Sequence, residues 1–508
     1  MDSPQSGPNE KTHIVAKSEP IPYDVPHQVP THDKAGLVQA EATADGVPVN
    51  DLEEGEKQDV RSGISGASLN TTNSILGSGI IGCSVVIMGI PYAFMKAGLP
   101  LGLILLVVIC GITDYSLRLM ITIGELTGTK TYAEMTESAL GIPGYYALSI
   151  VQFVYPFIAI CPPSDITIII GDTITLLEIL SLFASILAET NVLANRYFVI
   201  SIVTVLFNLP VSLYKNVTKL VKVAVVSLVL LVFIMIIVIV RLATMDVPHT
   251  EGAWAFGKPT FFESIGIIMF AFICQHNSFL VYDSLEQATS SRWAKVTHIS
   301  VFGAGIMCAV IGICGYVTFT GHTQGDLLEN YCYNDVLVNI ARVFFAVTIM
   351  CTFPLECFVC REVIENTMVR QGWVDSPQPL QRHLILTLII VGLVLGISMS
   401  TSCLGLVLTV NGVICAVPLI CFPSLCYLRV AEGSIYGRDK LPSLLISFVG
   451  LLIIISGIVT MIVDRNLTTC TQSEGFAYCQ PSDVVVNASA TPLPISLQPA
   501  SPLLADQS

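Results

Sequence analysis

Long apolar blocks separated by short polar segments follow one another from residue 64 to residue 463. A run of about 20 apolar residues is long enough to cross a bilayer as a helix. The pattern predicts eleven spans, at residues 64–96, 99–124, 143–181, 196–213, 217–243, 260–285, 297–320, 336–360, 383–400, 402–428 and 441–463. Pro162-Pro163 interrupts the long third span, so one kinked helix or two shorter segments are both open. We predict an all-α membrane protein with about eleven transmembrane helices.

The segments on either side of the spans are polar. Residues 1–61 are rich in proline and acidic residues and bury too little apolar surface to fold, so we expect a disordered cytoplasmic tail. Residues 62–465 form the expected transmembrane domain, and residues 466–508 form an extracytoplasmic polar tail. The first residues lack the basic and apolar regions of a signal peptide.

Basic residues indicate the orientation of the spans. Lys and Arg concentrate in cytoplasmic loops. With the N-terminus inside, the inner segments hold thirteen basic residues and the outer segments hold six, leaving the N-terminal tail uncounted. We therefore expect a cytoplasmic N-terminus and an extracytoplasmic C-terminus in a multi-pass protein. The sequence leaves the plasma and lysosomal membranes open, and we favour the plasma membrane.

This orientation gives the C-terminal tail two modifications. The sequons at Asn466 and Asn487 would be glycosylated, and Cys470 and Cys479 could form a disulfide, because the outer face is oxidising. The sequons at Asn70 and Asn216 fall in a span and on the inner side, so we expect them to stay unmodified.

Composition excludes several functions. Charged residues make up 12% of the chain, against about 25% in soluble domains. The net charge of −14 arises largely in the first 61 residues, with 12 acidic and 5 basic side chains, so no nucleic-acid partner is indicated. Most of the 16 cysteines lie in apolar blocks without metal-ligand spacing. Because catalytic and nucleotide-binding motifs are absent, we expect no enzyme and no cofactor beyond a coupling ion.

Three glycines within six residues disturb the first span. Gly77, Gly79 and Gly82 each cost a helix about 1 kcal/mol relative to alanine. A broken helix in a membrane lines a cavity or is buried in protein, and its freed amides and carbonyls suit a carboxylate and Na⁺. Alternatively, Gly77, Ser78 and Gly79 form a close helix-packing face. The pattern alone does not decide between the two.

The sixth span carries a matching polar run, Gln275-His276-Asn277-Ser278. Polar groups at that depth usually face a cavity, although His276 could equally bond to a neighbouring helix. Discontinuities five spans apart indicate two inverted five-helix repeats. The hydroxyls of Thr348 and Thr352 in the eighth span could complete a cation site, or could bond back to their own helix.

Several motifs give the chain a family resemblance. They are Asn73-Ser-Ile-Leu-Gly-Ser-Gly-Ile-Ile-Gly82, Gly89-Ile-Pro-Tyr-Ala-Phe94, His276-Asn-Ser-Phe-Leu-Val-Tyr282, Phe353-Pro-Leu-Glu-Cys-Phe358 and Leu408-Thr-Val-Asn-Gly-Val-Ile414. With them, residues 62–480 resemble the amino acid/auxin permease family, specifically its sodium-coupled neutral amino acid transporters. The resemblance implies the five-plus-five inverted-repeat fold of the bacterial leucine transporter and Na⁺-coupled symport of neutral amino acids by alternating access.

The resemblance also assigns site residues. It makes Asn73 a sodium ligand, joined by Thr348 or Thr352, and places the substrate carboxylate at the backbone of Gly77–Gly82. We expect the substrate to contact Gly77, Ser78, Gly79, Gly82, His276, Asn277 and Ser278.

Two segments depart from the family pattern, an extra stretch Cys83–Met88 and the interruption Cys161–Asp165. Six added helical residues advance a helix by about 9 Å and turn it by about 240° net. We therefore expect the outer half of the first span to fit poorly and the chain to be a weak or inactive transporter. The alternatives to Na⁺ symport are H⁺ coupling, with His276 as the titrating group, and a transport-inactive amino acid sensor or scaffold.

Overall fold

The computed structural model describes most of the predicted membrane domain. The described residues are 68, 80–160, 201–202, 204–213, 217–245, 247, 249–332, 334–375, 379–398, 404–463 and 477–479. Within these ranges all regular elements are helices, and 8 helices are long and apolar enough to cross a membrane; the apolar segment Phe261–Asn277 is shorter. The prediction of an all-α membrane protein is confirmed.

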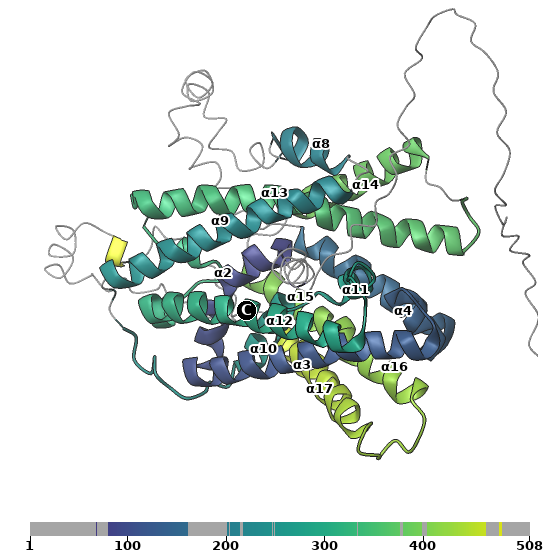
Figure 1. Cartoon of the computed structure of the whole chain (residues 1–508). Coiled ribbons are helices and arrows are strands. Elements are labelled where there is room, and N and C mark those ends of the chain that lie inside the picture. The colour runs from purple at the N-terminus through teal and green to yellow at the C-terminus, as the bar shows by residue number, and fades with distance from the viewer. Residues whose placement is uncertain are drawn as a thin grey trace, which may run out of the picture. The chain divides into compact units, whose positions relative to one another are not determined.

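Each predicted span contains helical segments (Figure 1). The elements are α2 (Ile80–Ala97), α3 (Leu99–Thr127), α4 (Tyr132–Ala159), η3 (Thr204–Asn208), α8 (Leu209–Ser212), α9 (Val217–Thr244), α10 (Phe261–Ala271), η4 (Gln275–Asn277), α11 (Ser278–Asp283), α12 (Ser290–Phe319), η5 (Thr320–His322), η6 (Leu327–Asn330), α13 (Val336–Arg370), α14 (Leu380–Ser398), α15 (Leu404–Ala416), η7 (Val417–Cys421), α16 (Phe422–Val430), α17 (Leu441–Val463) and η9 (Ala477–Cys479).

The connections between helices collect at two ends of the bundle. At the end predicted to be cytoplasmic, the hydroxyls of Tyr282 and Ser290 donate to the carboxylate of Glu125, at 2.7 and 2.9 Å. At the other end, Arg241 at the end of α9 pairs with Asp335 at the start of α13, 2.5 Å apart. These two helices run side by side in Figure 1. Each of these contacts joins two connections that the predicted topology places on the same side.

The helix α2 packs tightly between α10 and α12. Its outer half buries Met88, Ile90, Ala93 and Phe94 completely. The expectation that this half would fit poorly is wrong. The stretch Cys83–Met88 continues the helix instead of looping out, and the residues after it still present an apolar face to the core.

The helix α4 begins earlier than the predicted third span. The hydroxyl of Thr131 caps it by accepting a hydrogen bond from the amide of Glu134 at 3.2 Å, a common helix start. Gly141, with φ 73° and ψ −170°, then bends the chain before the apolar part. A glycine adopts this positive φ without steric cost. The predicted interruption at Pro162-Pro163 lies outside the described residues.

The tenth span is distorted at η7, a π-helical turn that contains Pro418. Pro423, at the start of α16 (Phe422–Val430), has no amide to donate to the carbonyls four and five residues before it, those of Leu419 and Pro418. The hydroxyl of Tyr132 donates to the carbonyl of Pro418, and that of Ser116 to the carbonyl of Leu419, both at 2.6 Å. The start of α4 and the middle of α3 thus hold this turn in place.

Candidate functional site

The sixth span is broken where the polar run predicted a discontinuity. The helix α10 ends at Ala271, residues 272–274 are not helical, and the 3₁₀ turn η4 leads into the short helix α11. The Oε1 atom of buried Gln275 accepts a hydrogen bond from the amide of Cys274 at 3.0 Å, which satisfies one freed backbone group. A broken membrane helix of this kind is stable because protein surrounds it.

His276 connects this break to α4. Its Nδ1 atom lies 2.6 Å from the hydroxyl of Tyr155, which is 1% exposed. The side chain of Asn411 on α15 donates to the backbone carbonyl of Tyr155 at 3.0 Å. The other ring nitrogen of His276, Nε2, is buried and has no hydrogen-bond partner among the described residues. His276 is therefore positioned by α4 and keeps one polar atom unpaired.

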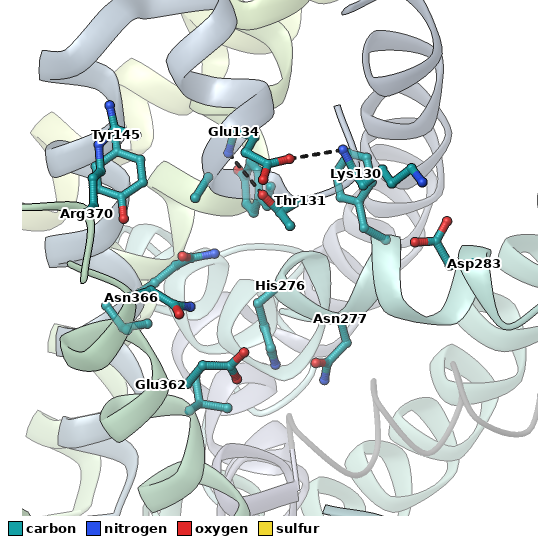
Figure 2. A pocket seen from close by; sticks show the side chains of 16 residues that line it. Lys130, Thr131, Glu134, Tyr145, His276, Asn277, Asp283, Glu362, Asn366 and Arg370 are labelled. Carbon is teal, nitrogen blue, oxygen red and sulfur yellow. Dashed lines mark hydrogen bonds between the residues drawn. The ribbon is translucent and has the colours of Figure 1, made fainter. Parts of the chain in front are cut away.

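A cavity of about 590 Å³ opens beside the break (Figure 2). His276 and Asn277 line it together with residues of α4 and of the second half of α13. In the view of Figure 2, the His276 side chain lies between those of Glu362 and Asn277. Lys130 and Arg370 also line the cavity, so it lies toward the side that the loop charges predict to be cytoplasmic. Its volume is within the range of small-molecule sites.

Only part of the predicted site is described. Asn73, Gly77, Ser78 and Gly79 lie outside the described residues, so the predicted break of the first span stays a prediction, and Gly82 lies in α2. His276 and Asn277 are brought together at the cavity. The buried hydroxyl of Ser278 instead faces its own backbone, 3.5 Å from the carbonyl of Cys274.

Thr348 and Thr352 lie one turn apart on α13, and both are buried. Their hydroxyls donate to carbonyls of the preceding turn, Thr348 to Phe344 at 2.8 Å and Thr352 to Thr348 at 2.9 Å. This is the bonding that the sequence left open as an alternative. A donating hydroxyl oxygen still has lone pairs, so the arrangement leaves both residues available as cation ligands.

Two buried residues near the break were not predicted from the sequence. Tyr155 lies in an apolar run, where a tyrosine has the same pattern as a packing residue. Glu356 was noted only as part of a family motif, yet it is 1% exposed, and neither carboxylate oxygen has a hydrogen-bond partner in the described part of the chain. An acidic residue in the middle of a predicted span was the signal that could have identified it.

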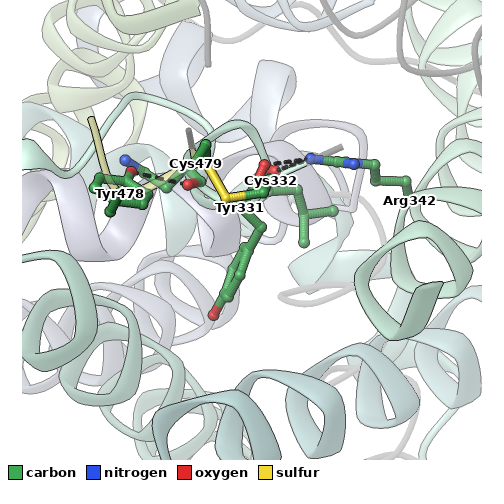
Figure 3. The surroundings of a disulfide bond; sticks show 7 residues. Tyr331, Cys332, Arg342, Tyr478 and Cys479 are labelled. Carbon is green, nitrogen blue, oxygen red and sulfur yellow. Dashed lines mark hydrogen bonds between the residues drawn. A yellow bond between two sulfur atoms is a disulfide. The ribbon is translucent and has the colours of Figure 1, made fainter. Parts of the chain in front are cut away.

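The predicted disulfide between Cys470 and Cys479 is wrong. Cys479 pairs with Cys332, in the connection between α12 and α13 (Figure 3). The hydroxyl of Tyr478 donates to the carbonyl of Asn330 at 2.9 Å, so the C-terminal segment docks on this connection beside the bond. The nearest cysteine in sequence was the wrong partner, because the fold returns the tail to a distant loop.

A bundle of apolar helices long enough to cross a membrane, with a broken helix that lines a cavity, is an arrangement typical of multi-pass transporters. The chain belongs to the transmembrane amino acid transporter protein family, which it matches over residues 61–463.

Named relatives agree with the family. The chain is 41% identical to "Putative sodium-coupled neutral amino acid transporter 11" of Danio rerio, over 84% of this chain and 92% of the relative. It is 28% identical to "Vacuolar amino acid transporter 2" of Saccharomyces cerevisiae, over 80% and 85% of the two chains. Among solved structures, a manganese transporter of Eremococcus coleocola aligns with a TM-score of 0.45 at 15% identity, over 82% of this chain and 91% of that chain.

Proposed function

We propose that this chain is a Na⁺-coupled symporter of neutral amino acids that works by alternating access. The observation that carries the proposal is the broken sixth span, whose His276 and Asn277 line a cavity of about 590 Å³. Relatives whose names specify sodium-coupled neutral amino acid transport support the choice of ion and substrate. We also propose the plasma membrane as its location, with the N-terminus in the cytoplasm.

In this proposal the first and sixth spans both contribute to binding. The backbone around Gly77–Gly82 would receive the substrate carboxylate, because amides freed from a helix attract anions. His276, Asn277 and Ser278 would contact the substrate from the sixth span. Asn73 would supply an amide oxygen to Na⁺, an ion that takes oxygen ligands in sites of this type.

The eighth span would complete the sodium site. Thr348 and Thr352 both have buried hydroxyls on α13. Thr352→Val keeps the shape of the side chain and removes the oxygen. We expect it, like Asn73→Ala, to raise the Na⁺ concentration needed for half-maximal uptake more than it changes substrate affinity at saturating Na⁺. Thr367→Val on the same helix is the matched control, since its hydroxyl also bonds back to the helix, at Val363.

Uptake by the full-length chain reconstituted in liposomes tests the proposal. Radiolabelled alanine, glutamine and leucine are supplied while the Na⁺ and pH gradients are varied separately. Uptake that follows the inward Na⁺ gradient supports symport. Uptake that follows only the pH gradient would replace Na⁺ with H⁺, and binding without uptake would make the chain a sensor or scaffold of the same fold.

A further inference from the structure

An ion pair joins two helices at the end of the bundle that lies away from the cavity. Nζ of Lys96, in the last turn of α2, lies 2.9 Å from Oε2 of Glu263, in the first turn of α10. The two side chains are only 17% and 7% exposed. The 11 residues of α10 then extend for about 16 Å to the break whose His276 lines the cavity. The pair therefore links the first and sixth spans on the far side of the break from the cavity.

The connection before α10 is fastened to the end of α2. We call residues 249–260 the cover. The hydroxyl of Thr260 donates to the carbonyl of Lys96 at 2.6 Å, and the amide of Lys258 donates to the carbonyl of Ala97 at 2.9 Å. Nζ of Lys258 donates to the carbonyl of Met95 at 2.8 Å. The last carbonyls of a helix have no partner within it, so the cover supplies the donors that the end of α2 needs.

The cover is also attached to the end of α12. The hydroxyl of Tyr316 donates to the carbonyl of Ala253 at 2.5 Å, and the amide of Thr250 donates to the hydroxyl of Thr320 at 3.1 Å. These contacts hold the cover at both of its ends, because Thr260 lies against α2 and Thr250 lies against the end of α12. The cover therefore bridges two helices beside the ion pair.

A buried ion pair favours two arrangements over those between them. In contact, the two charges compensate each other. Apart, each charge needs water, because an uncompensated buried charge is strongly unfavourable. Phe94 and Ile267, on the two helices that carry the pair, are completely buried, so water can reach separated charges only if α2 and α10 move apart. Separation of the pair is therefore coupled to opening of this end of the bundle.

We propose that Lys96 and Glu263 are the latch of a gate at this end, closed in the structure, and that the ion pair separates when the chain opens on the side opposite the cavity. The proposal rests on the transport function proposed above and adds the residues that close the second entrance. The predicted topology places this end outside, so the gate would admit substrate and Na⁺ from the outer side. Because α2 contains Gly82 and α10 leads to His276, the latch acts on the two spans that would contact the substrate.

Labelling of a cysteine behind the latch tests the gate directly. Ile267 lies one turn after Glu263, is completely buried, and faces α2, where a Cβ atom on Gly89 would lie 3.9 Å from it. Ile267→Cys is introduced into the full-length chain in nanodiscs, which is treated with a charged, water-soluble maleimide. We expect slow labelling while the ion pair is intact, and several-fold faster labelling when Glu263→Gln or Lys96→Met removes one charge.

Exchange of the two charges is the matched control. Lys96→Glu combined with Glu263→Lys restores an ion pair of opposite polarity and should return the labelling to its slow rate. Glu251→Gln removes an exposed charge from the cover and should leave the rate slow. Each charge variant without Ile267→Cys measures labelling of the native cysteines, and thereby unfolding. Equal labelling of Ile267→Cys with and without the ion pair, or fast labelling in the exchanged pair, would overturn the proposal.

A cross-link tests whether transport requires the cover to leave α2. The hydrogen bond between the backbones of Ala97 and Lys258 brings these residues close enough for Ala97→Cys and Lys258→Cys to form a disulfide. In liposomes, oxidation of this double variant should stop alanine exchange, and reductant should restore it. Ala97→Cys alone, treated in the same way, controls for effects on the bond between Cys332 and Cys479.

Alanine exchange that continues in the cross-linked chain would also overturn the proposal, because the gate would then open without movement of the cover. If the wild-type chain exchanges no amino acid, the proposed function fails. The labelling of Ile267→Cys still decides in that case whether the pair of Lys96 and Glu263 holds this end of the bundle closed.

Discussion

At the residue scale, buried charges between α12 and α13 are held by backbone groups. The guanidinium of Arg342, 2% exposed, donates to the carbonyls of Leu328 and Tyr331 at 3.0 and 2.8 Å. Asp326 is completely buried, and its Oδ1 atom accepts a hydrogen bond from the amide of Leu328 at 2.9 Å. Both side chains therefore fix the loop that carries Cys332.

Asp326 should make stability depend on pH. Burial raises its pKa from 3.8 to about 6, although the Leu328 amide and Arg342 oppose this change. Between these values the folded state binds more protons than the unfolded state, so the free energy of unfolding falls as pH rises from about 4 to about 6. Asp326→Asn keeps the amide contact and removes the buried charge. Above pH 6 we expect the free energy of unfolding of the variant to exceed that of wild type by on the order of 1–3 kcal/mol, so its melting temperature should be higher.

Melting curves of the purified protein in detergent between pH 4 and pH 8 measure this difference. It should shrink toward zero at the acidic end. Asp439→Asn changes an exposed aspartate and should show no such trend. A difference between Asp326→Asn and wild type that is constant with pH, or that grows at low pH, would show that Asp326 is stabilised as a carboxylate.

Residue roles were only partly predictable from the sequence. The polar run at His276 identified a site residue, because polar groups are rare inside apolar spans. The same rule applied to Glu356 but was not used there. The hydrogen bond between Tyr155 and His276 could not be predicted, since it joins residues 121 positions apart and depends on how α4 packs against the break.

At the element scale, glycines on α12 allow α2 to approach closely. A Cβ atom on Gly312 would lie 2.5 Å from a ring carbon of Phe94 and 2.7 Å from a side-chain carbon of Ile90, both fully buried. Gly312→Ala should therefore lower stability by about 1–3 kcal/mol, the usual cost of overpacking. Gly303→Ala on the same helix meets no atom within 4 Å and should be neutral or slightly stabilising.

The thermal midpoints of the two variants, measured in the same detergent, check this pair. A second readout is the fraction of protein at the cell surface, which we expect to fall only for Gly312→Ala. Equal behaviour of the two variants would mean that Phe94 moves aside freely and that the interface between α2 and α12 is loosely packed.

Elements were the most predictable level of this structure. Apolar runs predicted where helices lie, because a membrane span needs about 20 apolar residues whatever it packs against. The start of α4 at Tyr132 was missed, since its first part is polar enough to be read as a loop. The effect of Cys83–Met88 was misjudged, because a register argument ignores the neighbours that accommodate the helix.

At the scale of the whole molecule, the side of the membrane that each end of the chain faces is still a prediction from the loop charges. We expect Asn466 and Asn487 to carry glycans, and Asn70 and Asn216 to carry none, because the basic loops point the N-terminus inward. Glycosidase treatment should shift the mass of the protein expressed in cultured animal cells. Replacing both Asn466 and Asn487 with Gln should abolish the shift, and a shift that survives would reverse or revise the topology.

The disulfide between Cys332 and Cys479 ties the C-terminal segment to a loop 147 residues away. A protease site placed at the exposed turn near Gly433, between α16 and α17, separates the two cysteines into different fragments. After cleavage, denaturing electrophoresis without reductant should show one linked species, and reductant should release two. Cys470→Ser should keep the link, while Cys332→Ser and Cys479→Ser should each lose it. Fragments that separate without reductant in the wild type would restore the pairing of Cys479 with Cys470, which lies on the same fragment.

The link also requires both cysteines to face one oxidising compartment, so the same gel tests whether the loop after α12 and the C-terminal segment lie on the same side of the membrane.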